Sequence, residues 1–113
     1  MSVQTSGEGV VLVDLGQGSD LADELQNVTQ LVGERAGCDV IMDFSQVTFL
    51  GSGQLAGLLR LRKLVQGYGR RLVLCNVGRL TMGIFSVTGL DTVFEMAADP
   101  AAAAATVQAA VRV

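Results

Sequence analysis

A single serine lies between two glycines at Gly51-Ser52-Gly53, immediately ahead of a leucine-rich run. Residues 51–56, GSGQLA, fit the G-x-G-x-x-A pattern of loops that bind the pyrophosphate of a dinucleotide at a helix N-terminus. Two features argue against this chemistry. A loop separates the pattern from the preceding strand-like run, whereas the fingerprint forms the strand-to-helix turn itself, and the next apolar run ends in Cys75-Asn76 without an acid for a ribose hydroxyl. A small-molecule binding domain is therefore only the third hypothesis.

The same serine does not fit a catalytic nucleophile. A nucleophile elbow requires G-x-S-x-G, whereas here the glycines flank Ser52 directly, and the chain contains no histidine to activate it. The G-K-[ST] triplet of a P-loop is also absent. Cys38 and Cys75 each lie beside an apolar run with no histidine or second cysteine nearby, so we expect buried thiols. The sequence predicts no catalytic residue, no cofactor and no metal site.

Two interpretations of Ser52 remain open from the residues alone. As a helix cap, its side-chain oxygen would accept a hydrogen bond from an orphan backbone N–H, and the flanking glycines would relax the turn. As a phosphate acceptor, it would place an anion at a helix N-terminus, where the free N–H groups and the helix dipole favour negative charge. The glycines would then let a kinase backbone approach closely.

Composition limits the partners and the compartment. The 113 residues are 50% hydrophobic and 17% charged, with a net charge of −3, which does not suit a nucleic-acid surface. No run approaches the roughly 20 apolar residues of a membrane span, and the first residues lack the basic and apolar regions of an export signal. We expect a cytoplasmic protein without nucleic-acid binding or membrane insertion. One basic cluster is interpreted as a solvated face: Arg60, Arg62, Lys63, Arg70 and Arg71.

Hydrophobic periodicity predicts strands alternating with helices. Strands are expected over residues 10–13, 39–44, 71–75 and 92–96, and helices over about 20–32, 53–66, 79–87 and 101–111. Such alternation is typical of an α/β fold, in which a mainly parallel or mixed sheet of about four strands is packed by about four helices. We expect one domain over residues 1–113.

Each predicted helix carries its own pattern. The first has an apolar stripe at helical spacing, made of Leu21, Leu25, Val28 and Val32. The second has more apolar residues than one stripe needs, which predicts burial between the sheet and a neighbour and would support a weak homodimer. The third places Leu80, Ile84 and Val87 on one side and ends at Gly89 as a left-handed cap. Asp99-Pro100 supplies a cap and a first-turn proline for the last helix.

Residues 40–77, VIMDFSQVTFLGSGQLAGLLRLRKLVQGYGRRLVLCNV, resemble the core of the STAS domain, as in bacterial anti-sigma factor antagonists. The shared order is an apolar strand closed by Asp43, then Val47-Thr48-Phe49, then a serine that opens a leucine-rich helix, then glycine, arginine and another apolar strand. The resemblance continues through residues 88–96, TGLDTVFEM, and more weakly through residues 10–25. It implies the STAS fold and a regulatory protein that is not an enzyme.

The resemblance also implies a phosphate switch. In that family the serine at the position of Ser52 is phosphorylated by the partner anti-sigma factor, a serine kinase, and dephosphorylated by a dedicated serine phosphatase. The unphosphorylated antagonist binds the anti-sigma factor and frees the sigma factor. The expected partner-binding residues are Gly51, Ser52, Gly53 and Gln54, the loop at Ser19 and Asp20, and Arg79 and Met82 at the start of the third helix. Outside this role, Ser19 and Asp20 would cap a helix, Arg79 would be a surface charge and Met82 a core residue.

The sequence departs from the family at the switch itself. The family usually reads Asp-Ser-Ser/Thr-Gly, whereas this chain has Gly51, Ser52, Gly53 and Gln54, so the acid before the serine and the hydroxyl after it are missing. Some STAS domains are never phosphorylated and act as static modules in stress-sensing complexes or lipid-transporter assemblies. A scaffold of this kind is the second hypothesis. Asp43, which matches the family's acid, is expected to be structural.

Overall fold

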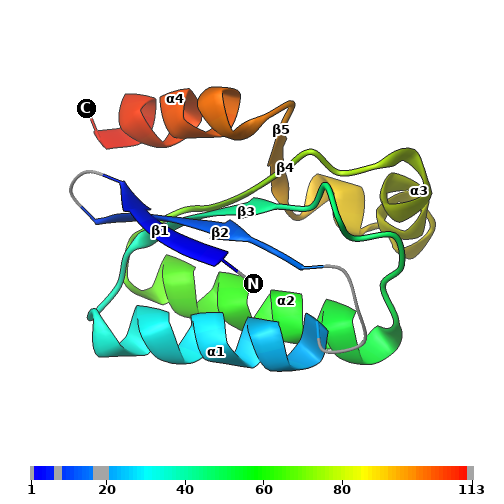
Figure 1. Cartoon of the computed structure of the whole chain (residues 1–113), viewed down its shortest axis with the longest axis horizontal. Helices are drawn as coiled ribbons and strands as arrows, with labels where there is room; N and C mark the ends of the chain where they lie inside the picture. The colour runs from blue at the N-terminus through cyan, green and yellow to red at the C-terminus, as the bar shows by residue number, and fades with distance from the viewer. Residues whose placement is uncertain (1, 7–8, 17–20, 112–113) are drawn as a thin grey trace.

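The computed structural model describes residues 2–6, 9–16 and 21–111, which form a five-stranded sheet packed by helices on both faces (Figure 1). The strands lie side by side in chain order: β1 (Ser2–Ser6), β2 (Val10–Asp14), β3 (Asp39–Asp43), β4 (Leu72–Cys75) and β5 (Glu95–Ala97). β1 is antiparallel to β2, and all other neighbours are parallel. The predicted α/β fold with a mainly parallel, mixed sheet is confirmed.

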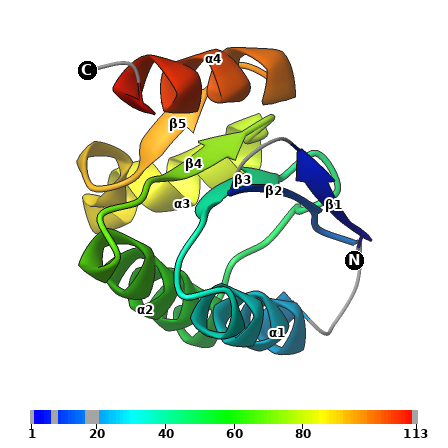
Figure 2. The same ribbon diagram turned by 90° about the vertical axis from the view of Figure 1, so that its left-hand side faces the viewer.

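The helices form two layers. α1 (Leu21–Glu34) and α2 (Ser52–Gly67) cover one face of the sheet, and α4 (Pro100–Val111) covers the other (Figures 1 and 2). α3 (Arg79–Thr88) and the short 3-10 helix η1 (Leu90–Thr92) lie at one end of the molecule, near the beginning of α2. Among the helices that the structure describes, none has the length and apolar character needed to cross a membrane.

The main core lies between the sheet and α1 and α2. The predicted stripe on α1 is confirmed, since its four residues are all buried. Three phenylalanines join separate elements at the carboxyl end of the strands: Phe85 on α3 packs edge to face against Phe44 and Phe94, with ring centroids 6.4 Å and 5.7 Å away. A smaller core under α4 contains Ile41 and Val73. α4 begins as predicted, because the Ala102 N–H donates to Asp99 Oδ1 at 2.8 Å.

The sequence prediction missed β1. Its residues, SVQTS, contain no apolar run and therefore give no strand signal. The strand exists because its backbone pairs with β2, with Ser2 opposite Asp14 and Ser6 opposite Val10. A side-chain contact from the turn after α1 adds to this pairing, since Arg35 Nη2 donates to Thr5 Oγ1 at 3.2 Å. Tertiary pairing, and not local propensity, makes this edge strand.

Three predictions about the helices and the last strand are corrected. The segment 92–96 is not one strand: the chain passes through η1 after Gly89, whose φ is 77°, and β5 begins only at Glu95. On α3 the predicted apolar side reaches the core only through the half-buried Ile84, while Leu80 and Val87 are exposed and the fully buried residues are Thr81 and Phe85. On α2 only part of the apolar excess is buried, and Leu59 faces solvent with 38% of its surface exposed.

The amino ends of the strands are fastened by charged groups. The buried Asp39 carboxylate accepts hydrogen bonds from Arg70 Nη2 and from the Arg71 backbone N–H, each at 2.9 Å, and Arg70 also donates to the Gly9 carbonyl at 2.9 Å. The Arg71 guanidinium forms an ion pair with Glu95 on β5. The predicted solvated basic cluster is therefore wrong for these two arginines, which are structural. The candidate site lies at the opposite end of the strands, where β3 leads into the loop before Ser52.

Candidate functional site

The loop of residues 44–51, between β3 and α2, presents Ser52. Asp43 starts this loop, because its Oδ1 accepts hydrogen bonds from the Ser45 N–H at 2.9 Å and from Asn76 Nδ2 at 3.2 Å. These contacts give Asp43 the structural role expected from the sequence. Val47 and Leu50 are buried and anchor the loop from inside. The loop is therefore held at both ends of its course across the edge of the sheet.

Ser52 is the first residue of α2 and is exposed. The prediction that it could cap the helix is wrong, because Gly51 occupies the cap position with an extended backbone (φ −88°, ψ 178°). Gln54 satisfies the cap instead: its Oε1 accepts a hydrogen bond from the Gly51 N–H at 2.8 Å. The helical ladder then begins with Leu55 N–H, which donates to the Gly51 carbonyl at 3.0 Å. The Ser52 hydroxyl is thus not needed to close the helix.

A buried hydrogen bond joins the loop to α3. Thr81 is buried, and its Oγ1 donates a hydrogen bond of 3.0 Å to the Val47 carbonyl. Because a buried carbonyl without a partner is costly, this bond fixes the position of the loop relative to the helix. Sequence reasoning missed Thr81, since a threonine on an amphipathic helix is typical of the solvent side. Its role is seen only in the structure, where Thr81 lies on the buried side of α3.

Large apolar side chains are exposed at this edge. Phe49 in the loop has 69% of its surface exposed, and its ring lies beside Gly51, 3.5 Å from the position a Cβ would take there. Leu80 on α3 is 76% exposed. From Phe44 to Leu59 the chain carries no charged side chain. Exposed large apolar side chains are typical of interaction sites, and the uncharged run was the signal in the sequence that could have pointed to Phe49.

The structure brings most of the predicted partner-binding residues to one edge. Gly51, Gly53 and Gln54 lie with Ser52 at the start of α2, and Arg79 and Met82 lie at the start of α3, which the Thr81 bond joins to the same loop (Figure 1). Arg79 is exposed and Met82 is half-buried, so Met82 is only partly a core residue. The predicted contacts at Ser19 and Asp20 fall outside the described residues.

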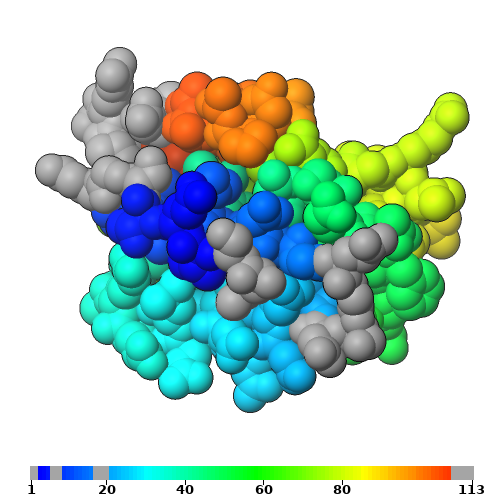
Figure 3. Space-filling view, in the orientation of Figure 1, coloured from blue at the N-terminus to red at the C-terminus, as the bar shows by residue number. Residues whose placement is uncertain are grey.

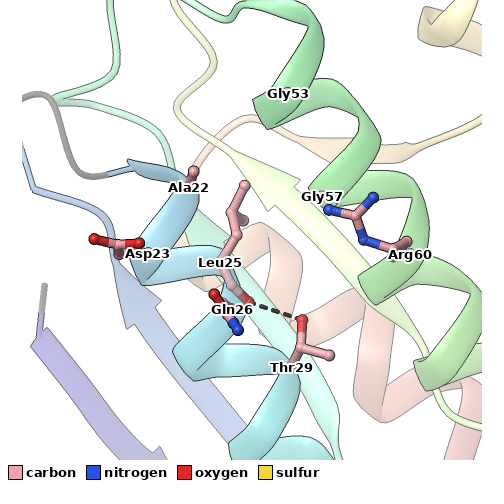
Figure 4. Close-up of a pocket in the computed structure, with 8 residues that line it drawn as sticks. All are labelled: Ala22, Asp23, Leu25, Gln26, Thr29, Gly53, Gly57 and Arg60. Atoms are coloured by element: carbon pink, nitrogen blue, oxygen red, sulfur yellow. Dashed lines mark hydrogen bonds between the residues drawn. The ribbon is translucent and has the colours of Figure 1, made fainter.

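A hollow of about 310 Å³ lies between α1 and α2 and begins at Gly53, directly after Ser52 (Figure 4). Two glycines of α2 line it: a Cβ at Gly53 would meet no atom within 4 Å, whereas a Cβ at Gly57 would lie only 3.3 Å from Leu25 Cδ1, because the helices pack closely there. Its walls carry both signs of charge, Asp23 on α1 and Arg60 on α2. The lining residues are Ala22, Asp23, Leu25, Gln26, Thr29, Gly53, Gly57 and Arg60. Ser52 itself does not line the hollow, which lies between the facing sides of α1 and α2 next to Gly53 (Figure 4).

Neither thiol is suited to chemistry at neutral pH. Burial, together with the nearby carboxylates, of which Asp43 contributes most, raises the pKa of Cys75 to about 11. Burial likewise raises the pKa of Cys38, against the opposing effect of Arg35. Within residues 2–6, 9–16 and 21–111, His, Cys, Asp and Glu form no group of three or more that could hold a metal ion. The arrangement at Ser52 offers an accessible hydroxyl beside the exposed ring of Phe49.

Comparisons with known proteins agree with this geometry. The family model described as "Mlab, STAS domain" matches residues 8–97. No curated protein matches the chain. Solved structures share the fold at low sequence identity. A serine-to-glutamate variant of RsbS from Moorella thermoacetica has a TM-score of 0.84 at 13% identity, covering 99% of this chain and 97% of its own.

Two further structures match over nearly their whole length. An anti-sigma-factor antagonist (STAS) domain protein from Planctomyces limnophilus has a TM-score of 0.75 at 19% identity, covering 94% of this chain and 97% of its own. A sulfate transporter family protein from Wolinella succinogenes has a TM-score of 0.80 at 16% identity, covering 97% and 93%. At these identities the likeness concerns the fold.

Proposed function

This chain belongs to the STAS domain family, and we propose that it is a non-enzymatic regulatory protein of the anti-sigma factor antagonist type. Residues 1–113 act as one domain in the cytoplasm. The edge around Ser52 docks an anti-sigma factor that is a serine kinase, a phosphate on Ser52 releases it, and a serine phosphatase restores docking. The observation that carries this proposal is the exposed position of Ser52 as the first residue of α2, beside the exposed ring of Phe49.

The local physics supports a switch that leaves the fold intact. A phosphate on Ser52 would meet the first-turn N–H groups and the positive end of the α2 dipole, and no acid in that turn opposes it. It would add roughly −1.5 to −2 charges to a surface that has none between Phe44 and Leu59. A partner whose apolar surface covers Phe49 would then have to desolvate a dianion. Binding is lost while folding is retained.

The proposal is tested by exchanging Ser52 in cells. Wild-type, Ser52→Ala and Ser52→Asp chains serve as baits in the source cells under growth and stress, with the Ser52 peptide and co-purifying proteins quantified by mass spectrometry. We expect a condition-dependent phosphate on wild type, a kinase retained by Ser52→Ala, and its loss from Ser52→Asp. Ala105→Asp, on the exposed side of α4, adds the same charge on the other face of the sheet and should retain the kinase. Equal retention by Ser52→Asp would refute the switch.

A second candidate is a constitutive scaffold subunit of a stress-sensing or transporter complex. It is favoured by the glycine at position 51, where the family usually has an acid, and by the exposed apolar side chains, which suit a permanent interface. A scaffold would carry no phosphate in any condition and would co-purify at fixed stoichiometry. In that case Ser52→Asp would either bind like wild type or dissociate the complex without a kinase among its members.

A further inference from the structure

We propose that the outward face of α3 binds a second copy of this chain as an antiparallel helix pair. Leu80 and Val87 expose 76% and 90% of their surfaces, and Ile84 between them is half-buried and also packs against the main core. The spacing i, i+4, i+7 places the three residues on one face of the helix. In Figures 1 and 3, α3 forms the right-hand edge of the molecule, and no other element lies beyond it. The face is therefore open for association.

Two charged residues at the ends of this face favour a second copy of the chain in an antiparallel orientation. Arg79 precedes the apolar face and Asp91 follows it in η1; both are exposed, and neither forms an ion pair within the part of the chain that the structure describes. A second copy that runs antiparallel, with a two-fold axis near Ile84, brings each Arg79 toward Asp91 of the other copy. The same axis sets Leu80 against Val87. A parallel pair would place like charges together, so the pattern is self-complementary only in the antiparallel arrangement.

The helix surface permits close contact at the centre of this pair. Gly83 lies beside Ile84, is exposed, and has no atom within 4 Å of the position a Cβ would take. The distance between packed helix axes depends on the side chains at the contact, so a glycine there favours a short distance. One helix face is smaller than the roughly 800 Å² per partner of a stable complex. We therefore expect a weak dimer, with a dissociation constant of about 0.1 mM.

The test is sedimentation equilibrium of the full chain from about 10 µM to about 1 mM, a range that brackets such a dissociation constant. We expect the mass to rise toward twice that of the monomer. Leu80→Ala and Val87→Ala should each weaken association about tenfold, because each removes exposed apolar contact while alanine favours the helix. Leu59→Ala is the matched control, since Leu59 is an exposed leucine on α2, the helix whose apolar excess suggested self-association from the sequence; it should leave association unchanged, and a loss there would place the contact on α2 and overturn the proposal.

Charge reversal tests the register independently of the apolar contact. Arg79→Glu and Asp91→Lys should each weaken self-association, and an equimolar mixture of the two variants should re-associate, because each copy then offers the charge the other lacks. Circular dichroism and thermal melting establish that each variant is folded. A chain that stays monomeric at about 1 mM, ten times the expected dissociation constant, would overturn the proposal. A dimer whose dissociation constant is unchanged by Leu80→Ala would also overturn it, as would a mixture of Arg79→Glu and Asp91→Lys that associates no more strongly than either variant alone.

The proposed dimer does not depend on the proposed phosphate switch at Ser52.

Discussion

Thr81 Oγ1 donates a hydrogen bond of 3.0 Å to the Val47 carbonyl, and this bond joins α3 to the loop that presents Ser52. Both groups are shielded from water, so neither can exchange its partner for solvent. The bond therefore fixes α3 and the loop relative to each other at this point.

Replacing Thr81 with valine keeps the shape and removes the donor. We expect the free energy of unfolding to fall by about 1–2 kcal/mol, because the Val47 carbonyl loses its partner. Urea denaturation measures the change. The control is Thr88→Val on the same helix, whose exposed hydroxyl bonds only to carbonyls of the preceding turn, and it should cost less than about 0.5 kcal/mol. Equal losses would mean that the Val47 bond contributes nothing specific.

Gly53→Ala should separate folding from docking. A Cβ at Gly53 meets no atom within 4 Å, so alanine should raise the free energy of unfolding by about 0.5 kcal/mol through helix propensity. The proposed function expects the same change to weaken partner binding, since Gly53 lies next to Ser52. Gly57→Ala should bring no such gain, because its Cβ would press on Leu25. Chemical denaturation compares the two, and a destabilised Gly53→Ala would contradict the open environment described above.

Asp39→Asn should cost about 2 kcal/mol of stability, because it leaves the Arg70 guanidinium without its counter-charge at a partly buried site. The amide oxygen can still accept from the Arg71 N–H, so the loss should stay below that of a fully broken network. Guanidinium denaturation of Asp39→Asn, Arg70→Met and the double variant gives the coupling between the two side chains. Additive losses would show that the pair acts independently.

Stability should fall as the pH rises above about 9, which is the ordinary range of a cysteine thiol. The pKa of Cys75 is raised to about 11 in the folded protein, so between these values the unfolded chain loses the thiol proton while the folded chain keeps it. This contribution is fully present below the unfolded pKa and is lost as the pH passes through the folded pKa. Denaturation from pH 8 to 10.5 should give a shallower decline for Cys75→Ala than for wild type. Identical slopes would exclude the thiol as a source.

Local sequence identified the elements with a regular apolar stripe, a continuous apolar run or a helix cap. The α1 stripe, the strands β2 to β4 and the Asp99 cap follow from local sequence, because burial and capping leave a regular signal. β1 could not be found in this way, since its polar residues become a strand only by pairing with β2. The prediction of the buried side of α3 failed because two of its large apolar residues, Leu80 and Val87, face solvent, while Thr81 and Phe85 face the core.

The candidate site was partly predictable for the same reason. A serine at the start of a helix could be located from its flanking glycines, but whether it capped the helix depended on the Gln54 side chain reaching back to Gly51. The exposure of Phe49 and Leu80 depends on how the loop and α3 dock, which no short stretch of sequence encodes. Tertiary contacts decided these points.

The uncharged run from Phe44 to Leu59 makes ionic strength informative. This run itself contributes no charge to long-range steering, so the salt dependence of association of the unmodified protein comes from charges outside the run, such as Arg79. A phosphate dianion on Ser52 adds a charge inside the run. The association rate of the phosphorylated protein should therefore depend more strongly on salt, because salt screens the interaction of this charge with the partner. The salt dependence of the association rate thus reports the chemical state of one hydroxyl without isolating the modified form.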